Sequence, residues 1–430
     1  MTINIPDSEK KRVVIVGAGF GGLKVAKQLS KEDFQVVLLD KNNYHQFQPL
    51  FYQVAMAGLE PSSISFPLRK AFQKNKNVFI RVTEVLEVYA NENYIGTDLG
   101  NLYYDYLVLA MGADTNFFGN EKLAEKTYPL KSVSEAIALR NAVFDDYEKA
   151  LTEPDYDDRQ GYIDIVVVGG GATGVEIAGA LAEMKKFIVP KDYGELNAKE
   201  IDIYLMQGSD CLLKGMSDKA SAKAEEFLLK LGVIVKLNSR VIDFDGEQVY
   251  LKDGSKIPTR KVIWAAGIKA NTIKGLEDEI YTYGSRVQVD RNSKIVGARN
   301  IFAIGDMALM KTEKYEHGHP QVAQVAIQQA KFLSKHIYNL ERNKTSKDFE
   351  YKDLGSMATI GRNKAVCDLP GIKFSGWFAW VVWLVVHLFS LIGTKNKVFV
   401  FINWIWNYFT YDQSLRLIIK PTEREQRSQK

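Results

Sequence analysis

Two glycine-rich stretches of the same form constrain the fold of this 430-residue chain more than any other feature. The first, Gly17–Gly22, follows the short β-branched run Arg12–Val16 and leads into a stretch with helical periodicity. A second apolar run then ends at Asp40, eighteen residues after the last of these glycines. A GxGxxG turn between a buried strand and a helix, with an acid about twenty residues further on, predicts a dinucleotide site. The glycines let a pyrophosphate approach the helix N-terminus, and the acid accepts ribose hydroxyls.

The same plan recurs later in the chain. Ile163–Val168 has the composition of a buried strand, and a second GxGxxG, Gly169–Gly174, and another helical stretch follow it. The next predicted strand ends at Gln207, where a ribose-binding acid is expected. This replacement is either a neutral substitution at a sheet edge that tolerates change, or the functional loss of a carboxylate that would repel a 2′-phosphate. Because Gln still hydrogen-bonds to ribose hydroxyls, NADH is the first expectation and NADPH is kept as the alternative.

A late strand completes the first fold. The apolar run Ile301–Ala308 contains Gly305 and Asp306, and an acid at the carboxyl end of a strand suits the ribityl hydroxyls of a flavin. We therefore predict an α/β chain with two Rossmann-type dinucleotide-binding domains, the second inserted in the first, and a C-terminal membrane-anchoring helical region. The expected boundaries are 1–160 and 269–345 for the first dinucleotide-binding domain, 161–268 for the inserted one and 346–430 for the C-terminal region, and the resemblance given below implies that the first is the FAD-binding domain and the inserted one the NAD(P)H-binding domain. The charged stretch 152–161 is expected to be a linker.

The stretch Pro320–Ala330 predicts a helix beside a planar ring. Pro320 suits the first turn of a helix, because it has no backbone donor to lose. Small residues recur on one side at spacings of three and four, namely Ala323, Ala326 and Ala330. Gln324 and Gln328 are four residues apart, so both amides project from one face. The alternative is a buried helix whose small residues serve packing only.

Glu176 lies two residues after the second glycine motif, in the first turn of the predicted helix. A carboxylate at this place is favoured by the helix dipole, which is a purely structural explanation. The functional explanation is a group that handles protons or nicotinamide in a pocket beside the flavin. Position alone does not separate the two.

The C-terminal region is apolar and aromatic, and then basic. Gly376–Gly393 has only His387 and Ser390 as polar side chains, which is borderline for a membrane span, and Val398–Tyr411 is shorter. A single span, a buried hairpin and two interfacial helices are the alternatives. Abundant Trp and Tyr and the short lengths favour interfacial helices. From residue 395 onward there are seven Lys or Arg and three Asp or Glu, which suggests an anionic lipid surface and no nucleic acid.

Together these features resemble the type II NADH:quinone oxidoreductases, which are single-subunit, non-pumping respiratory enzymes. The resemblance rests on YHQFQPLFYQVA, the paired glycine motifs, AQVAIQQA, LGSMATIGRNKAV and the aromatic tail. It implies FAD in the first domain, NADH in the inserted one, and two-electron reduction of a membrane quinone, ubiquinone or menaquinone. It also implies a homodimer and peripheral attachment to a lipid bilayer. No signal or transit peptide is visible in the sequence, so we expect the cytoplasmic face of a bacterial cell membrane.

The resemblance further implies which residues form the site. Catalytic roles are expected for Glu176, Gln324 and Gln328. FAD is expected to contact Gly17, Gly19, Phe20, Gly21, Gly22, Asp40, Lys41, Val82, Ala110, Gly112, Asp306, Ala323 and Gln324. NADH is expected to contact Gly169, Gly171, Gly174 and Gln207. The sequence departs from the family at Gln207, where an acid is usual, and this puts the nicotinamide preference in question.

Other functions share part of this pattern. A soluble reductase serving ferredoxin or rubredoxin has both glycine motifs but no need of an aromatic, basic tail. A sulfide:quinone oxidoreductase needs reactive cysteines, whereas Cys211 and Cys367 are far apart and in no CxxC pattern. A reductase that prefers NADPH and a non-enzymatic flavoprotein that senses NADH are further alternatives. No metal site is expected, because no other ligand is spaced to assist His387.

Overall fold

The computed structural model describes residues 3–412 and 415–419, which form two compact units. Each unit is assembled from three separate segments of the chain. Within the described residues, unit 1 comprises 3–46, 66–114 and 268–354, and unit 2 comprises 47–65, 115–267 and the residues from 355 onward. Residues 47–65 and 115–160, expected in the FAD-binding domain, thus pack within unit 2. The predicted boundaries of the FAD-binding and NAD(P)H-binding domains stay a prediction.

Unit 1 is built on a five-stranded parallel sheet. Its spatial order is β20-β9-β1-β2-β5, and each neighbouring pair runs parallel. The strands are β1 (Arg12–Val16), β2 (Gln35–Asp40), β5 (Val78–Val82), β9 (Tyr106–Leu109) and β20 (Ile301–Ala303). Since β20 enters this sheet after the whole of the second fold, the predicted insertion is confirmed.

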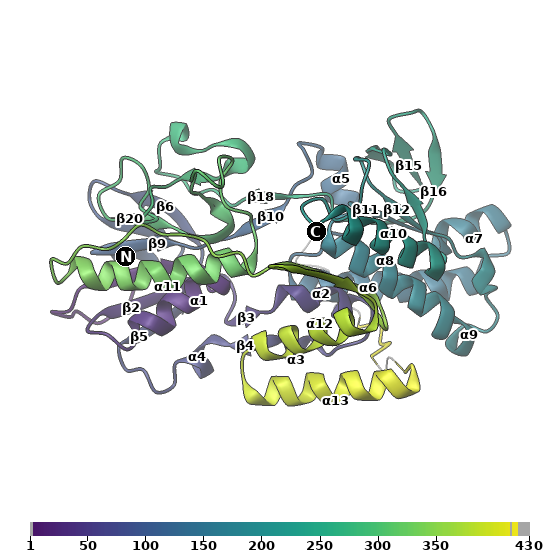
Figure 1. Ribbon diagram of the computed structural model, residues 1–430, viewed down its shortest axis with the longest axis horizontal. Helices are drawn as coiled ribbons and strands as arrows, with labels where there is room; N and C mark the ends of the chain where they lie inside the picture. The colour runs from purple at the N-terminus through teal and green to yellow at the C-terminus, as the bar shows by residue number, and fades with distance from the viewer. Residues whose placement is uncertain (1–2, 413–414, 420–430) are drawn as a thin grey trace. The chain divides into compact units, whose positions relative to one another are not determined.

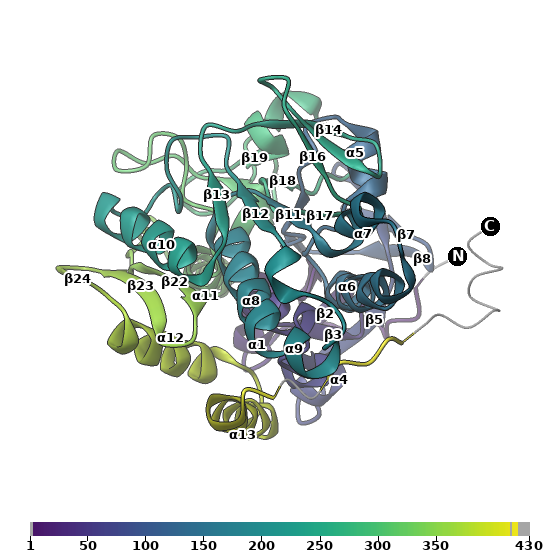
Figure 2. The ribbon, with the colours of Figure 1, turned by 90° about the vertical axis from the view of Figure 1, so that its right-hand side faces the viewer.

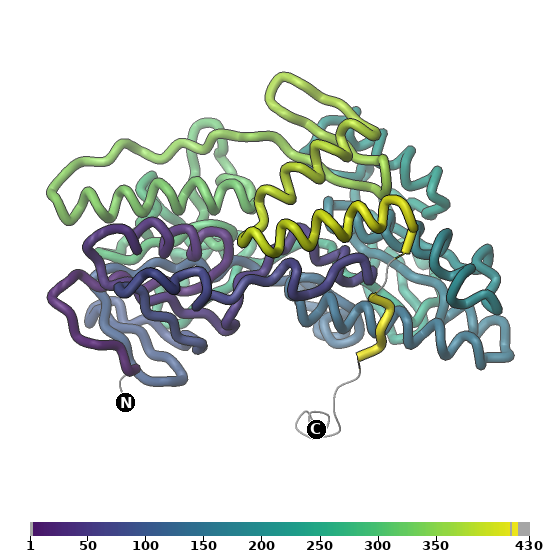
Figure 3. The backbone as a smooth tube through the Cα atoms, turned by 90° about the horizontal axis from the view of Figure 1, so that it is seen from below, coloured from purple at the N-terminus to yellow at the C-terminus, as the bar shows by residue number. Residues whose placement is uncertain are grey.

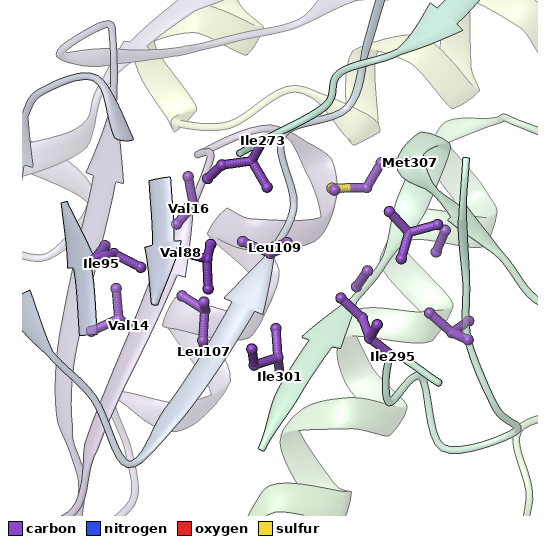
Figure 4. Close-up of a cluster of buried hydrophobic side chains, with 14 of the residues drawn as sticks. Val14, Val16, Val88, Ile95, Leu107, Leu109, Ile273, Ile295, Ile301 and Met307 are labelled. Carbon is purple, nitrogen blue, oxygen red and sulfur yellow. The ribbon is translucent and has the colours of Figure 1, made fainter. Parts of the chain in front are cut away.

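The sheet of unit 1 is covered on both faces. Helices α1 (Phe20–Leu29) and α11 (Ala323–Leu340) lie side by side (Figure 1). A small antiparallel sheet is formed by β6 (Val85–Tyr89), β7 (Tyr94–Thr97) and β8 (Gly100–Tyr103). Figure 4 shows the apolar core in which Val14 and Leu107 of the large sheet join Val88 and Ile95 of the small one. Burial of this aliphatic cluster fixes the orientation of the parallel strands.

Unit 2 repeats the arrangement with four parallel strands in the order β13-β12-β11-β17. These are β11 (Ile165–Val168), β12 (Ile203–Met206), β13 (Ile234–Lys236) and β17 (Lys261–Trp264), with helices α8 (Ala172–Phe187) and α10 (Asp218–Leu231). An antiparallel sheet of β14 (Val241–Phe244), β15 (Gln248–Leu251) and β16 (Lys256–Pro258) follows. The linker predicted at 152–161 is wrong in part, because helix α7 (Tyr156–Ile163) forms there with Asp155 as its N-cap. Helix α6 (Val133–Thr152) begins at the capping box of Ser132 and Glu135.

The C-terminal part of unit 2 is a three-stranded antiparallel sheet with two helices. The strands are β22 (Ser356–Gly361), β23 (Lys364–Leu369) and β24 (Ile372–Ser375), with α12 (Trp377–Ser390) on one side and α8 and α10 on the other (Figure 2). Helices α12 and α13 (Thr394–Thr410) form a hairpin, drawn in yellow in Figure 3. Among the described residues, no helix is both long enough and apolar enough to cross a membrane.

Helix α11 starts later than predicted. Its first residue is Ala323 and its N-cap is the extended Val322, so the placement of Pro320 in the first helical turn is wrong. The Val322 N–H donates to the Pro320 carbonyl at 3.0 Å, which makes a tight turn before the helix. The Gln321 side chain also donates to the Asp306 carbonyl at 2.8 Å. These bonds hold residues 320–322 outside the helix.

Short elements complete the two units. They are β3 (Tyr44–Gln46), α2 (Phe51–Ala55), α3 (Pro61–Ile64), β4 (Ser65–Pro67), α4 (Leu68–Ala71), β10 (Ala113–Thr115), α5 (Glu121–Lys126), α9 (Val189–Asp192), β18 (Ile268–Ala270), β19 (Val287–Gln288) and β21 (Ala308–Leu309).

Candidate active site

The residues predicted to bind FAD gather at one edge of the unit 1 sheet. Gly17 follows β1, Asp40 ends β2, Val82 ends β5, Ala110 follows β9 and Asp306 lies three residues after β20. Because all five strands are parallel, their carboxyl ends share this edge. Ligands of open α/β sheets bind at such an edge, so the fold brings together residues from five distant parts of the sequence.

The first glycine turn is close-packed at its ends and open in its middle. Gly17 has a φ of +98°, and a Cβ there would collide with the Ala110 carbonyl oxygen. A Cβ at Gly22 would collide with the carbonyl oxygen of Gly17. A Cβ at Gly19, by contrast, would meet no heavy atom within 4 Å. The outer glycines therefore shape the turn, while Gly19 leaves backbone open where a pyrophosphate can approach.

Asp40 is held by backbone donors. Its Oδ2 accepts from the Ala18 N–H at 2.6 Å and its Oδ1 accepts from the Asn42 N–H at 2.7 Å. Burial raises the pKa of this carboxyl. His45, which sequence analysis missed, has its Nδ1 2.8 Å from the Ala18 carbonyl and packs edge-on against Phe20. The glycine turn is thus fixed from both sides, and Asp40 has carboxylate lone pairs left for ribose hydroxyls.

The other predicted FAD contacts around this edge differ in accessibility. Gly112 has a φ of +68°, and a Cβ there would meet nothing within 4 Å. Val82 is exposed, whereas Ala110 is buried. The Lys41 ammonium forms an exposed ion pair with Glu84 at 2.7 Å. The open backbone at Gly112 and the exposed Val82 therefore leave room for a ligand at this edge. Lys41 is already paired with Glu84 and fits the role of a ligand contact less well.

Helix α11 contacts the turn after β20 through one glutamine, Gln329, that the sequence did not single out. Gln329 is buried, and its Oε1 accepts from the Gly305 N–H at 2.7 Å. Ala326 packs against the same turn, since a Cβ on Gly305 would lie 3.2 Å from the Ala326 Cβ. Ala330 is fully buried. Ala326 and Ala330 therefore serve close packing, as the structural alternative predicted, and Gln329 lies on this same buried face.

The two predicted catalytic glutamines hold a backbone segment. The Gln328 amide accepts from the Lys352 N–H at 3.0 Å and donates to the Lys352 carbonyl at 2.8 Å. Gln324 Oε1 accepts from the Leu354 N–H at 3.1 Å. Both side chains project from one face of α11, as their spacing predicted, and they bind residues 352–354 along the helix. Their role at the quinone stays a prediction.

The second glycine turn reproduces the first. A Cβ on Gly169 would collide with the Ala265 carbonyl oxygen, and one on Gly174 would collide with that of Gly169. A Cβ on Gly171 would meet nothing within 4 Å. Gln207 takes the place of Asp40, because its Oε1 accepts from the Gly170 N–H at 2.9 Å. A cavity of about 630 Å³ borders this edge and is lined by residues that include Gly169 and Gln207.

Glu176 borders a second cavity of unit 2, of about 120 Å³, between α8 and the C-terminal region. Its Oε1 accepts from the Thr359 N–H at 3.5 Å, and burial raises the pKa of its carboxyl to about 8. The indole of Trp383 lines the same cavity and stacks on His387, with ring centroids 3.9 Å apart. Trp404 also lines it and donates to Gln53 Oε1 at 2.8 Å. A carboxyl that keeps its proton at neutral pH among aromatic rings can act as a proton donor.

Glu183 lies two helical turns after Glu176 and borders the same cavity. Its Oε1 accepts from the Arg362 N–H at 2.6 Å, and burial raises the pKa of its carboxyl. The Arg362 guanidinium donates to the Asn407 and Tyr408 carbonyls at 2.6 and 2.8 Å. This chain of contacts ties α8 to the last turn of α13. Among the described residues, no three His, Cys, Asp or Glu side chains gather as metal ligands would.

Comparison with known proteins agrees with this geometry. The family model for pyridine nucleotide-disulphide oxidoreductases matches residues 11–330, and that for the NDH2 C-terminal domain matches residues 354–411. The type II NADH:quinone oxidoreductase Ndh of Mycobacterium tuberculosis is 34% identical over 415 residues, which cover 92% of this chain and 87% of that protein. The type II NADH:quinone oxidoreductase of Haemophilus influenzae is 29% identical over 388 residues, covering 84% and 87%.

A solved structure matches in fold over nearly the whole length. The structure of NDH2 from Plasmodium falciparum in complex with NADH superimposes with a TM-score of 0.88 and 24% identity, and the match covers 96% of this chain and 100% of that one. The predicted family is therefore confirmed. The chain belongs to the type II NADH:quinone oxidoreductases, and residues 11–330 carry the features of the pyridine nucleotide-disulphide oxidoreductases.

Proposed function

We propose that this chain oxidises NADH with bound FAD and reduces a membrane quinone, ubiquinone or menaquinone, by two electrons without pumping protons. The observation that carries the proposal is the presence in one chain of two glycine turns, each with an open middle glycine, and the NDH2 C-terminal domain. FAD, when bound, supplies the chemistry that accepts a hydride and releases electrons. The residues of the chain bind, orient and shield the reactants.

FAD binding is assigned to the carboxyl edge of the unit 1 sheet. The open backbone at Gly19 and the N-terminus of α1 suit the pyrophosphate, and Asp40 suits the ribose. Asp306, in the turn that Gln329 and Gln321 hold, suits the ribityl hydroxyls. The other predicted contacts keep their assignment as proposals: Gly17, Phe20, Gly21, Gly22, Lys41, Val82, Ala110, Gly112, Ala323 and Gln324.

NADH binding is assigned to the corresponding edge in unit 2. The backbone at Gly171 and the N-terminus of α8 suit the pyrophosphate, while Gly169 and Gly174 shape the turn. Gln207 is placed to hydrogen-bond a ribose hydroxyl from the end of β12. Its amide offers a neutral partner where the first fold has the carboxylate of Asp40.

Glu176 is assigned the proton chemistry that accompanies quinone reduction. Since its Oε1 accepts the Thr359 N–H, the proton held at neutral pH belongs on Oε2. Burial keeps the carboxyl neutral by raising its pKa, although the bonds from the Thr359 N–H and the Trp383 side chain act in the opposite direction. Gln324 and Gln328 are proposed to act at the quinone end by positioning residues 352–354 along α11.

The C-terminal helices are proposed to attach the protein to a lipid surface. Large apolar side chains are exposed on both, namely Trp377, Phe378, Val385, Val386 and Phe389 on α12, and Val398, Phe399, Phe401, Ile402, Ile405, Trp406 and Phe409 on α13. An apolar face of this size marks an interaction surface, and an aromatic one suits the membrane interface. Attachment at the cytoplasmic face remains a proposal, as does the homodimer, which the family resemblance implies.

The lipid surface predicts the behaviour of a double variant. Phe389 and Phe409 are 71% and 77% exposed, and their replacement by Asp puts two charges on the apolar face. Each buried Phe is worth about 1.5–3 kcal/mol, so we expect liposome binding to fall more than tenfold in a flotation assay. Turnover with NADH and a water-soluble acceptor should be retained. Tyr283→Asp, at a side chain 95% exposed in unit 1, is the control and should leave flotation unchanged. Equal flotation of the double variant and the parent protein would contradict the assignment.

Steady-state turnover tests the proposed function itself. Purified protein loaded with FAD is mixed with NADH and a short-chain quinone, and loss of NADH absorbance is followed. We expect quinone-dependent NADH oxidation at a stoichiometry of one quinone per NADH. No oxidation with any quinone analogue, together with fast reduction of ferredoxin or of a disulfide, would replace this function by that of a soluble reductase.

A further inference from the structure

We propose that Glu183 resupplies Glu176 with protons through water in the cavity of about 120 Å³ that both side chains border. This inference rests on the proposed function, because it concerns the source of the proton that Glu176 gives up during quinone reduction. Oxidation of NADH by a quinone takes up one proton from solution for each quinol formed. A buried proton donor therefore has to be reloaded once in every turnover.

The two carboxyls lie on one face of helix α8 with only a small side chain between them. Glu183 follows Glu176 by seven residues, which is two helical turns or about 10 Å along the axis. Ala180 lies between them on the same face and also borders the cavity, where its methyl group leaves the space open. The cavity has room for several water molecules, because one water needs only about 10–15 Å³ of such space. A row of waters can therefore connect the two carboxyls.

Polar groups in the lining suit water. The Oδ1 atom of Asn407 is buried, and no residue that the structure describes donates a hydrogen bond to it. Asn407 borders the cavity, as do Thr359 and Tyr52. A buried acceptor without a protein donor, beside a space of this size, is normally satisfied by ordered water. The hydroxyl of Tyr52 accepts from Gln53 Nε2 at 2.8 Å and keeps its own hydrogen for a further partner.

The charges around the two carboxyls set the direction of transfer. Burial raises the pKa of both. At Glu183, the cationic side chains of Arg362, Lys364 and Lys186 oppose that rise. At Glu176, hydrogen bonds oppose it and no described cation does. Glu183 therefore gives up its proton more readily than Glu176, and a proton moves from the first to the second.

The other titratable groups that adjacent helices bring to this region stay neutral. Burial raises the pKa of Tyr52, on α2, well above its usual value. Burial lowers the pKa of His387, on α12, to about 4, and this ring stacks on Trp383 of the cavity lining. Neither group takes the proton at neutral pH. The two glutamates are thus the groups between which it moves.

The transfer moves one proton and no electrons. Since Glu183 Oε1 accepts from the Arg362 N–H at 2.6 Å, its proton belongs on Oε2. That O–H bond breaks as the row of waters passes one proton on, and an O–H bond forms on the Glu176 carboxylate left by quinone reduction. Lys186, one turn after Glu183, is exposed, so solvent at this end of α8 returns a proton to Glu183.

The test compares the first turnover with later ones in Glu183→Gln. The amide still accepts from the Arg362 N–H, but it carries no transferable proton. Stopped flow with excess NADH and a short-chain quinone below pH 8 should show a first quinone reduction at the parent rate, because Glu176 starts protonated. Steady-state turnover should then be about tenfold slower than in the parent protein. It should slow further in D₂O and recover with small weak acids such as acetic or hydrazoic acid.

A second variant closes the path without removing an acid. Ala180→Ile fills the space between the two carboxyls, so it should show the same fast first turnover and slow later ones, with no recovery in small acids. Glu195→Gln, at an exposed glutamate, is the control and should match the parent protein. If Glu183→Gln fails to fold, Ala180→Ile carries the test alone.

Two results would overturn the inference. One is steady-state turnover equal to that of the parent protein in both variants, and the other is a first turnover slowed as much as the later ones, which indicates a structural role. If the parent protein reduces a quinone with NADH and the variants match it, only this inference fails. If the parent protein reduces no quinone, the proposed function fails.

Discussion

Glu176→Gln is expected to slow quinone reduction about 10- to 100-fold and, above neutral pH, to stabilise the fold. The amide keeps the shape of the side chain and its bond from the Thr359 N–H, but it carries no transferable proton. Loss of a positioned general acid costs a reaction a factor of this size or more. Stopped-flow measurement of the NADH and quinone half-reactions separately decides which step needs the proton. A loss confined to the NADH half-reaction would assign Glu176 to the nicotinamide, and no loss in either would remove it from catalysis.

The stability effect has a definite sign. Burial raises the pKa of Glu176 from the ordinary 4.5 to about 8, so between these values the folded state holds a proton that the unfolded state has lost. The stability of the parent protein therefore falls as pH rises from about 4.5 to 8 and levels off above that range. Gln has no such dependence, so the variant should gain about 5 kcal/mol relative to the parent by pH 9. Urea unfolding at pH 5 and pH 9 measures this difference.

A control variant and a contrary outcome sharpen this experiment. Glu195 is exposed, so Glu195→Gln should change the free energy of unfolding by less than about 0.5 kcal/mol at either pH. If Glu176→Gln shows the same small change at both pH values, Glu176 is ionised in the folded protein and cannot be the proton donor.

Gly19→Ala and Gly171→Ala are expected to remove one dinucleotide each. Neither glycine has a positive φ, and a Cβ on either meets no heavy atom within 4 Å, so both folds should tolerate alanine. The added methyl group instead occupies the open backbone that each turn offers to a pyrophosphate. An extra methyl in a close contact costs about 1–3 kcal/mol, or roughly 5- to 150-fold in affinity. Gly19→Ala should therefore lose FAD on dialysis, while Gly171→Ala should stay yellow and show a raised KM for NADH.

This pair tests the assignment of each fold to its ligand. FAD content is read from the absorbance of flavin released on denaturation, and KM for NADH is measured on the flavin-loaded fraction. Gly194→Ala, at a glycine without a positive φ and away from both turns, is the control and should change neither quantity. Loss of FAD from Gly171→Ala with an unaffected Gly19→Ala would reverse the two assignments.

Much of the site could be predicted because its signals are local in sequence. Each glycine turn, with the strand before it and the helix after it, is specified within about 30 residues, and the structure shows the expected packing at Gly17 and Gly169. Asp40 was found by its distance from the glycines, and its bond from the Ala18 N–H explains why that distance is fixed. The split of the first fold also followed from strand order, since β20 completes the sheet.

The rest depends on contacts between distant residues, which spacing does not encode. The sequence singles out Gln324 and Gln328, yet Gln329 holds the Gly305 turn and Gln328 holds Lys352. Nothing within the helix distinguishes adjacent glutamines until their partners are known. The sequence also predicts too early a start for α11, because the bond from Gln321 to the Asp306 carbonyl holds the residues before Ala323 outside the helix. Residues 152–161 looked like a charged linker, and a single N-cap, Asp155, starts a helix there.

The central claim is that electrons from NADH leave this chain on a quinone by way of its bound FAD. The most direct measurement is an anaerobic double-mixing experiment on the purified, FAD-loaded protein, in which flavin absorbance near 450 nm is followed. The account predicts bleaching on addition of one equivalent of NADH, and full recovery of the absorbance when a quinone is then mixed in. A protein that is colourless, or one that is bleached by NADH and stays bleached with every quinone offered, would contradict it.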